Sequence, residues 1–197
     1  MHAGSTRRLP VAMDLLWRPG SLTRSAALVL GGSALLAVSA KVQVPFWPVP
    51  MTMQSLAVVL VGIGLGSRLG VAAVLAYLAE GFLGLPVFAG PLAGPAYMAG
   101  PTGGYLVGFV LGAGCVGWLA ERGWDRSLPR AVAAMAIGHA LLFVPGVAWL
   151  AVLFGWQKAV AAGLMPFLFA TVAKTALGAA MVAAFWAVFE RRLSSRS

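Results

Sequence analysis

The stretch "AVAAMAIGHALLFVPGVAWLAVLFG" (residues 131–155) holds 25 consecutive positions without Asp, Glu, Lys or Arg. A helix that crosses a bilayer needs about 20 mostly apolar residues, so this stretch is long enough for one crossing. Similar uncharged runs occupy residues 25–40, 103–120 and 159–173. The whole chain is 60% hydrophobic and only 10% charged, with a mean hydropathy of +0.91, whereas soluble domains carry about 25% charged residues. We therefore predict a polytopic membrane protein.

Glycine, proline and charged positions divide the apolar runs into six predicted helices. They span residues 22–41, 53–66, 69–83, 104–121, 131–153 and 163–189. The second and third are separated only by "GSRLG" (66–70), where glycines beside Ser67 and Arg68 predict a tight turn at a membrane face. The expected fold is an all-α integral membrane domain over residues 1–197, with tails over about 1–21 and 190–197.

The basic residues indicate the orientation of these helices. The net charge is +9, and the arginines lie at positions 7, 8, 18, 24, 68, 122, 126, 130, 191, 192 and 196. If the N-terminus is inside, every arginine falls on the cytoplasmic side, and only Lys41 and Lys158 lie on the other. Cytoplasmic loops are enriched in Lys and Arg. We therefore predict that both termini are cytoplasmic and that the charge reflects topology, with no nucleic-acid partner.

The N-terminus also permits a second interpretation. "MHAGSTRR" is basic, an apolar run follows, and "VSA" (38–40) is typical of a signal-peptidase site. We favour a spanning helix, because Arg24 lies far from the start and the rest of the chain is itself predicted to lie in the membrane.

The predicted outer loops differ from the inner ones. Residues 41–54 and 84–105 are long, rich in Pro, Gly and aromatic residues, and uncharged apart from Lys41. Irregular backbone near membrane depth is tolerated where it is buried in protein or lines a cavity. The two loops therefore predict a lid over a pocket that opens outward.

Lys41, Glu80 and Lys174 lie inside or at the edge of predicted spans, and the last two are candidates for a pocket. Lys174 lies about 12 Å into the last span, since Pro166 suits the first turn of a helix, and Thr171 shares its face. Glu80 lies in the last turn of the third span. Charged groups in spans usually face a cavity or a partner, so the two side chains line a polar pocket, form a structural salt bridge, or do both.

The first predicted helix has small residues four positions apart, at Ala27 and Gly31 and at Ser33 and Ala37. Such spacing allows another helix to approach closely. It is equally compatible with packing inside the protein.

Signatures of enzymes are missing from the sequence. It contains neither G-x-x-x-x-G-K-[ST] nor G-x-S-x-G. The single Cys115, with His2 and His139, offers no metal-ligand cluster. We expect no catalysis, metal or cofactor, and any active transport would draw its energy from another chain.

Three motifs in register resemble the BioY family, the biotin-binding S components of energy-coupling-factor (ECF) transporters. They are "PVPMTMQ" (48–54), "GLPVFAG" (84–90) and "GPTGGYLVGF" (100–109). The resemblance covers about residues 25–190. It implies a six-helix protein of a prokaryotic cell membrane that captures biotin from outside and assembles with a transmembrane T component and two ABC-type ATPases. It also implies that the small-residue face of the first helix docks the partner.

One departure concerns the last helix, where the family pattern resembles P-F-x-P-G-D-x-x-K and this chain has "PFLFATVAK" (166–174). The lysine is retained as Lys174, whereas the carboxylate is replaced by Thr171, so its role falls to Thr171 or Glu80. Which end of biotin meets Lys174 stays open. The predicted substrate-binding residues are Gln54, Glu80, Phe88, Tyr97, Thr102, Gly103, Gly104, Tyr105, Thr171 and Lys174.

Overall fold

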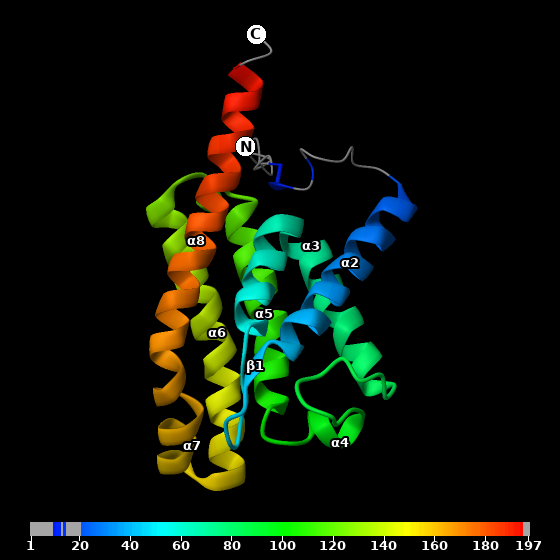
Figure 1. Ribbon diagram of the computed structural model, residues 1–197, viewed down its shortest axis with the longest axis vertical. Coiled ribbons are helices and arrows are strands. Elements are labelled where there is room, and N and C mark those ends of the chain that lie inside the picture. The colour runs from blue at the N-terminus through cyan, green and yellow to red at the C-terminus, as the bar shows by residue number, and fades with distance from the viewer. Residues whose placement is uncertain (1–9, 13, 15–20, 195–197) are drawn as a thin grey trace, which may run out of the picture.

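The computed structural model describes residues 10–12, 14 and 21–194, and it is a bundle of long helices standing side by side (Figure 1). The described residues contain five helical stretches that are long and apolar enough to cross a membrane. The long helices are α2 (Leu22–Lys41), α3 (Gln54–Phe82), α5 (Gly103–Ala120), α6 (Leu128–Phe154) and α8 (Met165–Ser194). The short elements are β1 (Gln43–Val44), β2 (Met51–Thr52), α4 (Pro95–Met98), η1 (Trp124–Arg126) and α7 (Trp156–Gly163).

Helix α3 reverses its direction at Gly66. This residue has φ 77° and ψ 177°, a conformation that side chains disfavour, while the residues on both sides are helical. The Gln54 side chain donates to the Tyr77 hydroxyl over 2.6 Å, although the two residues would lie about 35 Å apart in a straight helix. The Glu121 carboxylate accepts hydrogen bonds from the Ser67 amide and hydroxyl, at 2.8 and 2.7 Å. The predicted turn at residues 66–70 is thus confirmed, but it is tighter than expected because one glycine makes it.

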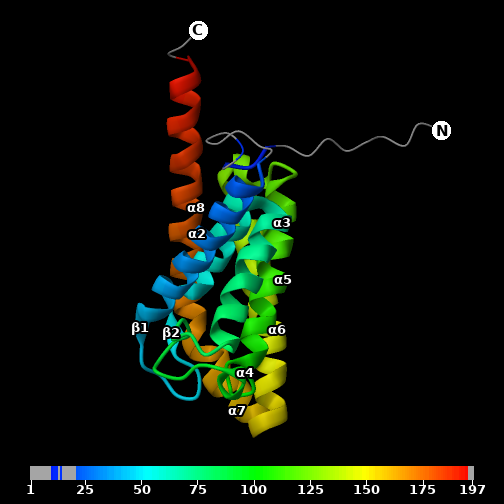
Figure 2. The ribbon, with the colours of Figure 1, turned by 90° about the vertical axis from the view of Figure 1, so that its right-hand side faces the viewer.

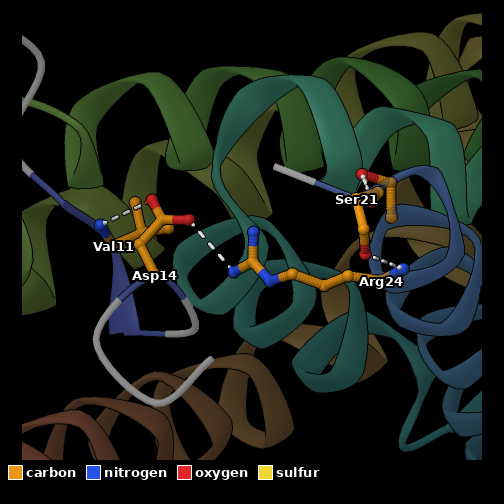
Figure 3. Close-up of polar contacts among 5 residues, drawn as sticks. Val11, Asp14, Ser21 and Arg24 are labelled. Carbon is orange, nitrogen blue, oxygen red and sulfur yellow. Dashed lines mark hydrogen bonds and ion pairs between the residues drawn. The ribbon is translucent and has the colours of Figure 1, made fainter. Parts of the chain in front are cut away.

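The helix ends that carry arginine lie together at one end of the bundle. The start of α2, the end of α5, η1, the start of α6 and the end of α8 meet there, whereas the β-hairpin, α4 and α7 lie at the opposite end (Figure 1, Figure 2). Arg24 of α2 reaches Asp14 over 3.1 Å (Figure 3). Arg126 donates to the Pro10 carbonyl over 3.0 Å, and Val11 is buried. Part of the predicted N-terminal tail therefore packs on this end of the bundle, while residues 1–9, 13 and 15–20 lie outside the described part.

The same end is joined to α8 through Asp125. Its carboxylate accepts a hydrogen bond from the Trp186 indole over 3.0 Å, and the Arg126 guanidinium lies 3.9 Å from the centre of that indole ring. Burial raises the pKa of the Asp125 carboxyl, against the opposing effect of the Arg126 charge. These contacts fix α8 against the connection between α5 and α6.

The structure corrects two predicted boundaries and adds one helix. Helix α6 begins at Leu128 rather than at residue 131, and α8 continues to Ser194, through most of the predicted C-terminal tail. Helix α7 was missed, because residues 154–162 were left as a connection between two predicted helices. A single non-helical residue, Gly155 at φ 84°, separates the end of α6 from the start of α7.

Candidate ligand-binding site

A cavity of about 60 Å³ lies at the end of the bundle opposite the arginines. Residues of the β-hairpin and the start of α3 form one wall, and α5, α6 and the start of α8 form the others. Six of the predicted site residues line it, namely Gln54, Tyr97, Thr102, Tyr105, Thr171 and Lys174. The remaining four, Glu80, Phe88, Gly103 and Gly104, are outside its lining.

Lys174 is the charged group of this cavity. Only 9% of the residue is exposed. Its ammonium donates to the Thr52 carbonyl over 2.6 Å and to the Ser55 hydroxyl over 3.1 Å. Within the described residues no carboxylate forms an ion pair with it. A buried charge is costly unless it is paired, and here its protein partners are neutral.

Glu80 has a different partner. Its carboxylate accepts a hydrogen bond from the Ser33 hydroxyl of α2 over 2.6 Å. The alternative of a salt bridge between Glu80 and Lys174 is not formed in the structure, and Glu80 connects α3 to α2 instead. Of the two candidates for the role of the missing family carboxylate, only Thr171 lines the cavity.

Aromatic rings form a layered wall. Tyr97 lines the cavity and stacks on Phe88, with ring centres 4.6 Å apart and an angle of 12° between the rings. Phe88 is fully buried behind it and makes an edge contact with Tyr77 at 5.4 Å. Burial also raises the pKa of the Tyr97 phenol, which keeps a neutral hydroxyl at the wall. Phe88 therefore packs behind Tyr97 and supports this wall without lining the cavity.

Tyr105 joins the cavity to α7. Its hydroxyl donates to the Gly163 carbonyl over 2.6 Å, and its ring makes an edge contact with Phe143 at 6.1 Å. Phe143 in turn contacts Phe167 at 6.3 Å. These rings give the cavity an apolar floor across α5, α6 and α8.

Gly103 and Gly104 approach protein backbone rather than the cavity. A Cβ atom on Gly103 would lie 2.0 Å from the Met98 carbonyl oxygen, and one on Gly104 would lie 2.3 Å from the Pro145 carbonyl oxygen. The close approach predicted from these glycines is thus present, but the neighbours are α4 and α6.

The outer loop of residues 84–102 is held by side chains that bind its carbonyls. Lys41 donates to the Phe88 carbonyl over 2.8 Å and to the Gly90 carbonyl over 3.4 Å. The Trp149 indole donates to the Gly100 carbonyl over 2.9 Å. In the hairpin loop, the ring of Phe46 packs on that of Phe167 and the ring of Trp47 packs on that of Phe154, with ring centres 6.1 and 5.8 Å apart. Both loops therefore cover the cavity end of the bundle.

The predicted docking residues of α2 lie on two different faces. Ala27 and Gly31 are exposed and line an apolar groove of about 340 Å³ against the first arm of α3. Ser33 is fully buried, and Ala37 packs against the core. Of the two predicted pairs, only the first faces outward.

Several cavity residues were missed in the sequence, including Ser55, Phe109, Leu142 and Phe143. Ser55 directly follows the motif of residues 48–54 that was singled out, so its position was a usable signal. The other three are apolar residues in apolar helices, and nothing in the pattern distinguishes the side that faces a cavity.

The profile of the BioY family matches residues 8–191 of this chain. The chain belongs to the BioY family. The predicted resemblance is thereby confirmed, and with it the expectation of a multi-pass membrane protein.

Individual members of the BioY family also match this chain. The "Biotin transporter BioY2" of Lactococcus lactis subsp. cremoris (strain MG1363) is 36% identical over 155 residues, which cover 78% of this chain and 85% of the relative. The "Probable biotin transporter BioY" of Pyrococcus horikoshii is 37% identical over 153 residues, which cover 78% of this chain and 90% of the relative. The crystal structure of the S-component for biotin from an ECF-type ABC transporter matches with a TM-score of 0.72 at 22% identity, covering 82% of this chain and 90% of that one. This BioY chain therefore has the S-component fold.

Proposed function

We propose that this chain is the S component of an ECF transporter, which binds biotin from outside the cell and mediates its uptake. The observation that carries the proposal is Lys174, a buried ammonium whose partners among the described residues are neutral, at the edge of an aromatic cavity. Biotin offers a carboxylate and a polar ureido ring to such a cation, and its fused apolar ring suits the aromatic walls. The BioY relatives that are described as biotin transporters support the same ligand.

Binding requires the loops over the cavity to move. Sites for ligands of this size have volumes of roughly 300 Å³ or more, whereas the cavity measures about 60 Å³. The loops of residues 41–54 and 84–102 cover the cavity end of the bundle (Figure 2), so their displacement would enlarge the site. We therefore assign them the role of a gate.

The orientation follows from the charges. We propose six crossings of a prokaryotic plasma membrane, with the two arms of α3 counted separately, and with the arginine-bearing end in the cytoplasm. In a Cys115→Ser background, a cysteine at Lys158 should react with an impermeant reagent in intact cells, whereas one at Arg68 should not. Labelling at Arg68 would refute this orientation.

The energy for uptake comes from other chains. We assign the docking of a transmembrane T component, which carries two ABC-type ATPases, to the exposed face of α2 around Ala27 and Gly31. Close helix packing in membranes favours small residues at such positions. The chain itself binds the substrate and performs no catalysis.

Binding to the purified protein in detergent tests the function. Isothermal titration with biotin, lipoate, pantothenate and thiamine should show tight binding of biotin alone. Tight binding of another vitamin in place of biotin would change the substrate. Conversion of a ligand by the purified protein would indicate an intramembrane enzyme, and flux through vesicles without the ATPases would indicate a facilitator.

A further inference from the structure

We infer that Tyr77 is a positioning residue that fixes the orientation of the Gln54 side-chain amide, so that Gln54 presents its carbonyl oxygen to the cavity and selects a ligand with an N–H group. The inference rests on the proposed biotin-binding function and deepens it. Tyr77 is fully buried and does not line the cavity, whereas Gln54 does.

The orientation follows from donors and acceptors. The Tyr77 hydroxyl has one hydrogen, which it donates to the Val87 carbonyl over 3.3 Å. A backbone carbonyl can only accept, so the hydroxyl oxygen must accept from Gln54. The group of Gln54 that faces Tyr77 at 2.6 Å is therefore the NH₂ group, Nε2. The alternative amide orientation would place two acceptors against each other.

The opposite side of the amide is left for a ligand. Gln54 Oε1 makes no hydrogen bond within the described residues, where the Gln54 side chain bonds only through Nε2. It is also not one of the polar atoms that are sealed without a partner in this part of the chain. Since Gln54 is 4% exposed and lines the cavity, we assign its accessible oxygen to the cavity surface.

Tyr77 is itself held in place. Its ring makes an edge contact with Phe88 at 5.4 Å, and Phe88 stacks on Tyr97. A rigid hydroxyl on the second arm of α3 thus determines which amide atom the first arm offers. An acceptor oxygen at the cavity suits the ureido N–H of biotin and repels a ligand that places an oxygen there.

The test compares biotin with its two cyclic carbamate analogues, in each of which one ureido N–H is replaced by a ring oxygen. Size and tail stay the same, so the ratio of dissociation constants reports the N–H alone. The wild-type protein should prefer biotin over at least one analogue by about 30-fold, as expected when a buried acceptor loses its donor. In Tyr77→Phe the amide is free to rotate and donate to the ring oxygen, and the preference should fall to about 3-fold.

Two further variants separate positioning from general effects. Trp149→Phe also removes a side-chain donor to the outer loop, through Gly100, but it does not contact Gln54, so it should keep the wild-type ratio. Gln54→Glu retains an acceptor at the cavity whatever Tyr77 does, and it too should keep a strong preference for biotin. This second variant tests the acceptor role even if Tyr77→Phe does not fold.

The outcomes are distinct. An unchanged ratio in Tyr77→Phe, or a lost preference in Gln54→Glu, would overturn the inference while the biotin function stands. An equal loss of preference in Trp149→Phe would also overturn it, because loop anchoring would then be the cause. A wild-type protein that does not bind biotin would overturn the proposed function and this inference together.

Discussion

Replacing Lys174 with methionine tests whether the cavity cation holds the ligand. Methionine has a similar length and no charge, so it fills the same space without the ammonium. Breaking a buried charged hydrogen bond to a ligand costs about 2–5 kcal/mol. At about 1.4 kcal/mol for each tenfold change, the dissociation constant for biotin should rise by roughly 30- to 4000-fold.

The stability of the free protein should change little. The variant loses the hydrogen bonds to Thr52 and Ser55, each worth about 1.5–3 kcal/mol. It also removes a buried ammonium, whose desolvation costs several kcal/mol, so the two effects offset each other. We expect a melting temperature in detergent within a few degrees of wild type.

Titration calorimetry with biotin measures the affinity, and Lys158→Met is the matched control. Lys158 is an exposed lysine of α7 at the same end of the bundle, outside the cavity, so its loss should leave binding unchanged. Lys174→Arg should bind biotin less tightly than wild type, because the guanidinium is larger and planar. Biotin affinity within threefold of wild type in Lys174→Met would refute the assignment.

Three other perturbations follow from the structure. Gly31→Trp should prevent co-purification with the T component while biotin binding persists, whereas Ser33→Trp, at a buried position, should lower the melting temperature; normal assembly of Gly31→Trp would place the docking face elsewhere. Gly66→Ala should destabilise the protein by about 1–3 kcal/mol, because φ 77° with ψ 177° is a region that is essentially restricted to glycine, while Gly64→Ala, in open helical space, should not; equal melting temperatures would contradict this. Lys41→Met should speed biotin dissociation several-fold in stopped-flow measurements by releasing the outer loop, and an unchanged rate would show that the loop is held by other contacts.

The sequence was most informative where composition and spacing have few structural solutions. Long uncharged runs fixed the membrane class, and glycine on both sides of Ser67 and Arg68 marked a reversal that the structure places at Gly66. Lys174 was identified because an ionisable residue within a span is rare. Ser33 and Glu80 were both singled out, but their contact was not, since it joins residues 47 positions apart.

What could not be predicted depends on the rotation of each helix about its axis. Ala and Gly occur on every side of α2, so the sequence did not distinguish exposed Gly31 from buried Ser33. The same limit applies to Phe143, whose place at the cavity depends on how α6 faces α8. For Gly103 and Gly104 the need for space was predicted, but not that Met98 and Pro145 would occupy it.

The outer loop is anchored through atoms that every amino acid possesses. Lys41, Tyr77 and Trp149 each bind it through a main-chain carbonyl, at Phe88, Val87 and Gly100. Substitution of the loop residues leaves these acceptors in place, so the loop can diverge in sequence without losing its attachment. The helices thus provide fixed attachment points for this loop, and these points do not depend on the side chains that the loop carries.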